Sequence, residues 1–375
     1  MRYRPLSLLP IAILFVALAA GQQSRPPRAE RWSAEQAQEW CRQYPWLVGA
    51  NFNPSTAINQ LEMWRAGDFD PDTIDRELGY AEAIGFNCMR VYLHDLAYEQ
   101  DPEGFLDRID QYLAIADRHG IVTMFVIFDD CWNSRFTADQ QFEPVPGVHN
   151  SGWLQSPGGH LMATYPDDAQ LQQRLERYVK AVLTRFADDQ RILAWDLYNE
   201  PGNTGVGATE TYQQSFMLVK DVFGWAREVN PSQPLTVCHW RHDENTDPMS
   251  RYSIDHSDLV TYHNYSGPEN LRAHTESIIR LADGRPVICT EYMARPRGST
   301  FEGTLPIFAE FNVGAINWGF AAGRSNTIYP WSSWDQPGKL PEPDVWFHDI
   351  VRPDGSPYSE DEVEFIRQIT AEQRK

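Results

Sequence analysis

The chain has 375 residues, 42% of them hydrophobic and 22% charged, which is enough for one large α/β domain or two ordinary ones. Its formal net charge is −20 at pH 7, from 52 acidic and 32 basic side chains. Nucleic acid and anionic membrane surfaces both bind basic protein faces, so this charge argues against them as partners and favours a neutral ligand.

Residues 1–20 have the three parts of a secretory signal peptide. Two arginines precede the apolar run SLLPIAILFVALAA, and small residues offer a cleavage site before Gly21. An N-terminal membrane anchor is the alternative, but the run is short for a span. We therefore expect a secreted or periplasmic protein that has no membrane contact after cleavage. Residues 21–44 are expected to form a flexible lead and a short helix near 33–43.

From residue 45 to residue 375 the sequence alternates short apolar strands with amphipathic helices. Strands are expected at 46–52, 86–93, 121–128, 192–198, 234–240, 259–265, 286–292 and 314–320. Helical patterns cover 72–85, 103–119, 167–188, 210–229, 269–282, 299–312 and 360–372. The segment that joins the fifth and sixth strands has the weakest helical pattern.

Eight strands alternating with helices predict a single-domain α/β fold, the (β/α)8 TIM barrel. A doubly wound sheet is the rival fold, but GANFNPS after the first strand is not a Gly-rich phosphate loop. Long loops are expected at 129–166, 241–257 and 321–358, after the third, fifth and eighth strands. Loops at this end of the strands build the active site in barrels of this kind.

Polar or aromatic side chains follow nearly every predicted strand. They are Arg90, Asp129, Asp130, Asn199, Glu200, His239, Trp240, His263, Tyr265, Glu291 and Trp318. A chain that merely folds has no need of a charged or hydrogen-bonding group at nearly every such position. These residues are therefore the candidates for a site at the barrel mouth.

Glu200 and Glu291 end the fourth and seventh strands, which face each other across the barrel mouth. Two carboxylates in one pocket suit glycoside hydrolysis, one as nucleophile and the other as acid and then base. A nucleophile must stay ionised, so it requires donors such as Arg90 and Tyr265. An acid requires burial and a negative neighbour. The structural alternatives are a helix cap for Glu200 and a salt bridge for Glu291.

Together these motifs resemble the glycoside hydrolases of clan A, and family 5, the cellulase and mannanase family, most closely. The resemblance covers about residues 46–370 and rests on FNCMRVYL, WDLYNEP, YHNY, ICTEY and INWGF. It implies a retaining mechanism on a β-linked oligo- or polysaccharide, with Glu200 as the acid/base and Glu291 as the nucleophile. It also implies that Asn199 binds the substrate 2-hydroxyl, that Arg90 and Tyr265 orient Glu291, that His263 lines the site and that Trp318 floors the −1 subsite.

The chain departs from the family after the third strand, where FDDCWN replaces a common Asp-x-His run, and in the first loop, NFNPSTAINQLEMW. Further candidates for substrate binding are Glu62, Asp130, Trp132, His239 and Trp240. For Asp130, capping a turn is nearly as good an interpretation as substrate binding, and His239 could be a core histidine. Among Trp132, Trp153, Trp240, Trp331, Trp334 and Trp346, some are expected to pack rather than to bind sugar.

No cofactor and no metal are predicted, because His-x-His, His-Glu-x-x-His and Cys-x-x-Cys spacings do not occur in the sequence. Three of the five cysteines, Cys88, Cys238 and Cys289, fall in predicted strands, where buried thiols are common. A single disulfide is possible, and the sequence does not assign its partners. A transglycosylase on the same site, a non-catalytic carbohydrate-binding barrel and, last, a metal-dependent hydrolase are the alternatives. The sugar, the linkage, exo or endo action and the oligomeric state are not readable from the sequence.

Overall fold

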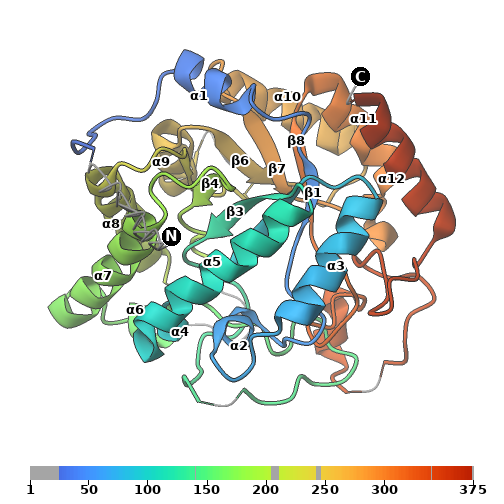
Figure 1. The fold of residues 1–375 in the computed structure, drawn as a ribbon, viewed down its shortest axis with the longest axis horizontal. Helices are drawn as coiled ribbons and strands as arrows, with labels where there is room; N and C mark the ends of the chain where they lie inside the picture. The colour runs from blue at the N-terminus through green and yellow to red at the C-terminus, as the bar shows by residue number, and fades with distance from the viewer. Residues whose placement is uncertain (1–24, 140, 204–210, 242–245, 339, 374–375) are drawn as a thin grey trace, which may run out of the picture.

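Eight parallel strands form the centre of the computed structural model, which describes residues 25–139, 141–203, 211–241, 246–338 and 340–373 (Figure 1). The strands are β1 (Val48–Asn51), β2 (Cys88–Tyr92), β3 (Val122–Val126), β4 (Ile192–Asp196), β5 (Leu235–Thr236), β6 (Val260–His263), β7 (Val287–Glu291) and β8 (Gly314–Asn317). Their order is β5-β4-β3-β2-β1-β8-β7-β6. An isolated parallel bridge between His239 and Tyr262 joins the two ends of this sheet. The predicted (β/α)8 barrel is therefore confirmed.

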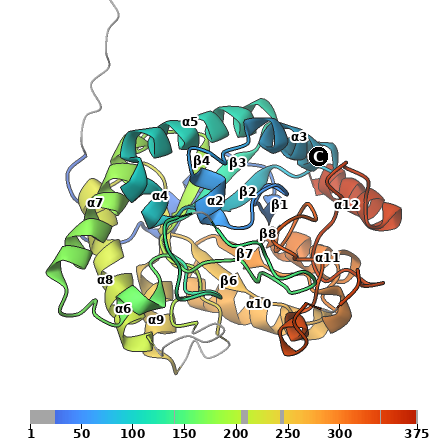
Figure 2. The same cartoon turned by 90° about the horizontal axis from the view of Figure 1, so that it is seen from below.

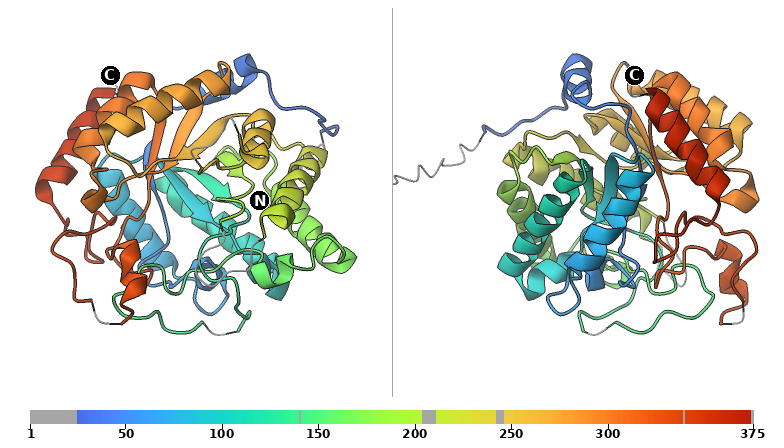
Figure 3. Two further views of the ribbon diagram at one scale, coloured as in Figure 1. Left: turned by 180° about the vertical axis from the view of Figure 1, so that it is seen from behind. Right: turned by 45° about the vertical axis from the view of Figure 1, so that its right-hand side comes forward.

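Helices surround the strands, as Figures 1 and 3 show from several sides. The main ones are α1 (Ala34–Cys41), α3 (Pro71–Ala83), α5 (Pro102–Arg118), α7 (Ala169–Arg185), α8 (Tyr212–Val229), α9 (Pro248–His256), α10 (Pro268–Ala282), α11 (Phe301–Phe311) and α12 (Glu360–Gln373). Shorter helices lie in the loops: α2 (Gln60–Trp64), α4 (Asp95–Gln100), α6 (Gly159–Met162), η1 (Arg295–Arg297) and η2 (Trp331–Asp335).

The strands are apolar because both of their faces are covered. All five residues of β4 are buried, as are all five of β2 and β7. Parallel strands enclosed by helices have this pattern, since neither face of the sheet contacts water. Arg90 on β2 and Asp196 on β4 break the pattern, because both side chains are charged and fully buried inside the barrel.

The prediction for the connection between β5 and β6 was wrong in one respect. Residues 241–257 were expected to form a loop, but α9 occupies 248–256. This helix has little apolar periodicity in PMSRYSIDH, and its start is instead specified by Asp247 and Pro248. The Asp247 carboxylate accepts a hydrogen bond from the Ser250 backbone N–H at 2.7 Å, which satisfies a donor of the first turn. β5 is also shorter than the expected 234–240.

Two residues of the N-terminal lead contact the barrel. The Arg28 guanidinium and the Trp32 backbone N–H each donate to the Asp258 carboxylate at 2.8 Å. The predicted signal peptide, residues 1–20, lies outside the described residues. None of the described helices is long and apolar enough to cross a membrane. All five cysteines are free thiols, and Cys88, Cys238 and Cys289 are buried as expected.

Candidate active site

A cleft of about 650 Å³ opens at the carboxyl ends of the strands. Figure 2 shows the 129–166 loop, in green, passing in front of the strands at this end of the barrel. The residues that line the cleft are Cys131, Trp132, His149, Asn150, Asn199, Glu200, Asn203, Trp240, His263, Asn264, Tyr265, Ser266, Glu291, Arg297, Trp318 and Trp331. Aromatic rings together with a few polar groups are typical of a site that binds a small molecule.

Glu291, the last residue of β7, is held by donors on both carboxylate oxygens. Its Oε1 accepts from the Arg90 guanidinium at 3.0 Å and from the Tyr92 hydroxyl at 2.9 Å. Its Oε2 accepts from the Tyr265 hydroxyl at 2.6 Å. A carboxylate with a cation and hydroxyl donors around it is stabilised in its ionised form.

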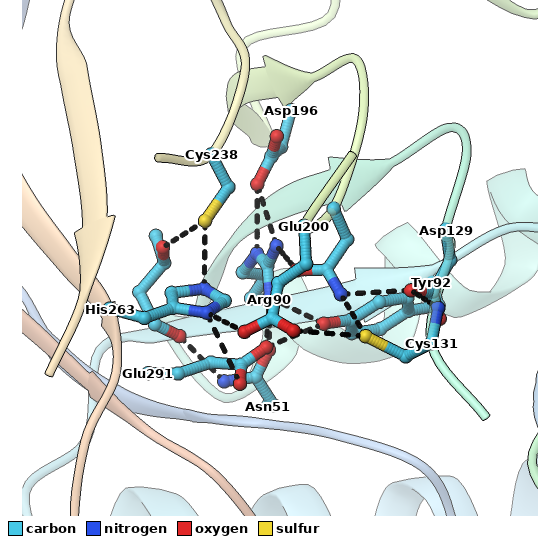
Figure 4. A network of polar contacts seen from close by, with 12 residues as sticks. Asn51, Arg90, Tyr92, Asp129, Cys131, Asp196, Glu200, Cys238, His263 and Glu291 are labelled. Atoms are coloured by element: carbon cyan, nitrogen blue, oxygen red, sulfur yellow. Dashed lines mark hydrogen bonds and ion pairs between the residues drawn. The ribbon is translucent and has the colours of Figure 1, made fainter. Parts of the chain in front are cut away.

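Arg90 is the centre of this network, as Figure 4 shows. Its Nη2 donates to Asp196 at 2.7 Å and to the Asn199 side-chain oxygen at 2.7 Å. Its Nη1 donates to the Asn51 side-chain oxygen at 2.8 Å in addition to Glu291. Two buried carboxylates thus share one buried guanidinium. Arg90 fixes the position of Asn199 as well as that of Glu291.

Glu200 lies on a strained turn just after β4. Its φ is +43°, in the left-handed region that few non-glycine residues occupy, and Pro201 and Gly202 follow it. Asp130 holds the turn from behind, because its carboxylate accepts from the Gly202 N–H at 2.7 Å and from the Ser215 hydroxyl at 2.6 Å. This turn is what aims the Glu200 side chain into the cleft.

The Glu200 carboxylate contacts three polar side chains. Its Oε1 lies 2.6 Å from Nδ1 of His263. Its Oε2 accepts from the Asn203 amide at 2.6 Å and from the Cys131 thiol at 3.2 Å. Unlike Glu291, Glu200 has no direct contact with a guanidinium in the part of the chain that the structure describes.

The tautomer of His263 follows from its second nitrogen. Burial lowers the pKa of His263 to about 3, so the ring is neutral near pH 7. Nε2 lies 2.9 Å from the Cys238 sulfur, and burial raises the pKa of that thiol well above its usual value. The thiol therefore keeps its proton and donates it to Nε2, which leaves the ring proton on Nδ1. His263 then donates to Glu200.

Burial raises the pKa of both glutamates above the ordinary value. For Glu200, hydrogen bonds from Asn203 and Cys131 oppose this shift. For Glu291, the negative charge of Glu200 adds to the shift, and the opposing influences include the charge of Arg90 and the Tyr265 hydroxyl. Because only Glu291 bonds directly to Arg90, we expect Glu291 to carry the negative charge when the two carboxyls share one proton.

Glu200, His263 and Glu291 also offer donor atoms that lie within 4.8 Å of one another, and they are the one such group among the described residues. Two carboxylates and an imidazole are a donor set that binds divalent cations. However, the Arg90 guanidinium lies 3.0 Å from a Glu291 oxygen and would repel a cation there. The arrangement suits proton transfer and nucleophilic attack better than metal binding.

Residues 56–322 match the family model described as "Cellulase (glycosyl hydrolase family 5)". This match covers more than two thirds of the sequence. The chain belongs to glycoside hydrolase family 5.

Curated relatives of this family 5 chain include fungal mannanases. A probable mannan endo-1,4-beta-mannosidase F of Emericella nidulans is 24% identical over 210 residues, which cover 50% of this chain and 45% of that protein. A probable mannan endo-1,4-beta-mannosidase A-2 of Aspergillus terreus is 32% identical over 208 residues, which cover 51% and 49%. The chain spans about half the length of the curated relatives it matches.

Solved structures share the fold of the family 5 chain at low sequence identity. GH5_18 from Streptomyces cattleya in complex with GlcNAc has a TM-score of 0.61 at 14% identity, covering 88% of this chain and 80% of that one. The endo-1,4-beta-D-mannanase from Thermotoga petrophila has a TM-score of 0.53 at 16% identity, covering 88% and 99%. The exo-beta-1,4-mannosidase from Opitutaceae bacterium strain TAV5 has a TM-score of 0.58 at 19% identity, covering 88% and 60%.

The structure brings most of the sequence-predicted residues of this family 5 site together. Eight of them line the cleft: Trp132, Asn199, Glu200, Trp240, His263, Tyr265, Glu291 and Trp318. Arg90 lies beneath the cleft against Glu291. Three predicted substrate-binding residues do not line it: Asp130 is buried behind the Glu200 turn, His239 is buried and not among the lining residues, and Glu62 on α2 contacts Arg324. These three residues lie outside the cleft lining, and their contact with a substrate stays a prediction.

Sequence reasoning missed several residues of the site, including Asn51, Tyr92, Cys131, Asp196 and Asn203. Tyr92 carried a readable signal, because it lies two residues after Arg90 on one strand and so points to the same side. Asp196 carried a weaker signal as a lone charge within an apolar strand. Cys131 and Asn203 lie in loops, where the sequence does not show which side chains reach Glu200.

Replacing Arg90 with Met is expected to destabilise the fold strongly. The change leaves the Asp196 carboxylate, which is fully buried, without its cation. Breaking a buried ion pair from one side costs about 3–5 kcal/mol of unfolding free energy. The measurement is urea unfolding of Arg90→Met beside Arg352→Met, whose ion pair with Glu342 is about half exposed and should be worth less than about 1 kcal/mol. Equal losses in the two variants would contradict this account of Arg90.

Proposed function

We propose that this family 5 chain is a retaining β-glycosidase, with Glu291 as nucleophile and Glu200 as acid and base. The observation that carries the proposal is the pairing of two buried carboxylates in one cleft, with an oxygen of each less than 4.8 Å apart. Inverting enzymes hold their carboxyl groups roughly 6.5–9.5 Å apart to leave room for a water molecule, and retaining enzymes about 5–5.5 Å apart. The separation here supports retention.

The first step of the proposed mechanism forms a bond between a Glu291 oxygen and the anomeric carbon of the sugar. The bond from that carbon to the leaving oxygen breaks, and the Glu200 proton passes to the leaving oxygen. In the second step Glu200, now ionised, takes a proton from a water molecule that attacks the same carbon and releases Glu291. Arg90, Tyr92 and Tyr265 hold the Glu291 carboxylate in position for both steps.

We propose β-1,4-linked manno-oligosaccharides as the first substrates to test, because the relatives quoted above are named as acting on mannan. The cleft suits a neutral sugar, since its aromatic lining can stack on pyranose faces and its amides can bind hydroxyls. The deciding experiment is NMR of the products of β-1,4-mannopentaose at early times. A β-configured new reducing end is expected. An α-configured end formed first would contradict retention.

The pH dependence of kcat/KM should be bell-shaped. Activity is lost as pH falls through the pKa of Glu291, because the nucleophile must be ionised, and as pH rises through the pKa of Glu200, because the acid must hold a proton. Burial raises the Glu200 pKa, so the alkaline limb should lie above the usual range for a carboxyl group. On an activated aryl glycoside, kcat/KM of the Glu200→Gln variant should no longer fall at alkaline pH and should still fall at acid pH. Persistence of the alkaline limb would assign it to another group.

A further inference from the structure

The long loops after β3 and β8 are bonded to each other. The His149 backbone N–H donates to the Ser333 hydroxyl at 2.9 Å, and the Asn150 N–H donates to the Ser325 carbonyl at 2.9 Å. The Trp334 indole N–H donates to the His149 carbonyl at 2.8 Å. We call residues 143–154 and 324–335 the loop wall. In Figure 1 the green and red loops that contain it meet at the lower side of the molecule.

The loop wall is also fixed to the barrel. The Asn59 amide, at the start of α2, donates to the Gly152 carbonyl at 2.7 Å. Arg324 forms ion pairs with Glu62 of α2 at 3.3 Å and with Glu143 at 2.7 Å. Loops anchored to each other and to a helix beneath them form a rigid barrier.

Aromatic side chains fill the inner face of the loop wall. Trp334 stacks on Trp132 with ring centroids 5.6 Å apart and an interplanar angle of 9°. Trp153 packs against Trp318 and Tyr92 at 5.4 and 5.2 Å between ring centroids. The wall therefore continues directly into the base of the cleft, with its rings packed against each other.

The chemistry of the proposed site tells which end of the substrate meets this wall. Glu200 must face the leaving oxygen, so the departing part of the glycan lies on the side of Glu200 away from Glu291. On that side lie Asn203 and Trp240, whose indole N–H donates to the Pro201 carbonyl at 3.1 Å. The loop wall reaches the other side, because Trp153 packs on Tyr92 at the end of β2 and on Trp318 just after β8, and Gly152 bonds to the start of α2, which follows β1. The sugar that becomes bonded to Glu291 lies there, at the non-reducing end of the substrate.

We infer that the loop wall closes the cleft beyond the non-reducing sugar, so that the enzyme shortens β-linked chains stepwise from that end. The inference rests on the proposed function and adds its direction and mode of action. Because an internal bond could reach the two glutamates only if several sugars passed through the wall, cleavage inside a polymer is disfavoured. This differs from the endo action in the names of the curated relatives.

The test uses β-1,4-mannopentaose labelled at its reducing end and a soluble galactomannan. Stepwise action should shorten the labelled chain in sequence, and it should release reducing sugar from galactomannan with little loss of viscosity. Labelled short products that appear first, with a rapid viscosity drop, would overturn the exo inference alone. No cleavage of either substrate would overturn the mannan-directed function and this inference with it.

Opening the wall gives a second test. Trp334→Ala removes the stacking partner of Trp132 and the bond to His149, and Arg324→Ala removes the ties to Glu62 and Glu143. With each variant, the viscosity of the galactomannan solution should fall several-fold more per bond cleaved than with the unaltered enzyme. Phe142→Ala is the control, since that side chain is 90% exposed in the same loop. If neither opened variant differs from the control, with thermal unfolding unchanged in all three, the wall does not set the mode of action.

Discussion

Glu291→Ala is expected to abolish turnover almost completely. Without the nucleophile no glycosyl-enzyme bond forms, and loss of a catalytic nucleophile costs on the order of 10⁵–10⁶-fold in kcat. The measurement is hydrolysis of an activated aryl β-glycoside. Glu310→Ala is the matched control, because Glu310 is an exposed carboxylate whose partner is Arg272, and its activity should be unchanged.

Sodium azide should partly restore the Glu291→Ala variant. Azide fits the space left by the carboxylate and attacks the anomeric carbon from that face, while Glu200 still protonates the leaving group. The product is then the α-glycosyl azide, with configuration inverted relative to the substrate. Undiminished hydrolysis in the variant would remove Glu291 from the mechanism. A β-configured glycosyl azide would instead indicate that Glu200 is the nucleophile and Glu291 the acid and base.

Glu200→Ala is expected to show a different pattern, which depends on the leaving group. Loss of a general acid costs roughly 10²–10⁴-fold for a sugar leaving group, which needs a proton to depart. A dinitrophenyl leaving group departs without one, so formation of the glycosyl-enzyme should stay fast and the intermediate should accumulate. The measurement is a burst of dinitrophenol, followed by slow turnover.

Azide distinguishes the two glutamates in this second variant as well. It should attack the glycosyl-enzyme from the face that the leaving group vacated, which gives the β-glycosyl azide.

The Asn203→Ala variant should be measured beside Glu200→Ala, because it removes a hydrogen bond to Glu200 at 2.6 Å without removing the carboxyl group. A Glu200→Ala variant that lost activity equally on all leaving groups would indicate a structural role for Glu200.

The barrel was predictable because of a physical constraint on its strands. Parallel strands covered on both sides must be apolar, so each one stands out as a short hydrophobic run, and the polar residue after it marks the barrel mouth. This is why Glu200 and Glu291 could be placed opposite each other. α9 was missed because its start depends on the Asp247 cap rather than on apolar periodicity.

The support around the two glutamates was less predictable. Arg90 was identified, but its fully buried partner Asp196 belongs to a strand 106 residues away in sequence. Asp130 was read as a substrate contact because it follows a strand, whereas its side chain turns back to hold the Gly202 N–H. The Asp130 contact depends on side-chain direction in a loop, which strand periodicity does not specify.

The contacts of the N-terminal lead have a consequence for attachment. Arg28 and Trp32 bond to Asp258, and the indole N–H of Trp40 on α1 donates to the Leu193 carbonyl at the start of β4. The lead is thereby fastened at the amino ends of the strands, on the opposite face from the cleft. A carrier protein, bead or cell surface joined through this end would hold the barrel with its mouth directed outward, accessible to a large insoluble glycan.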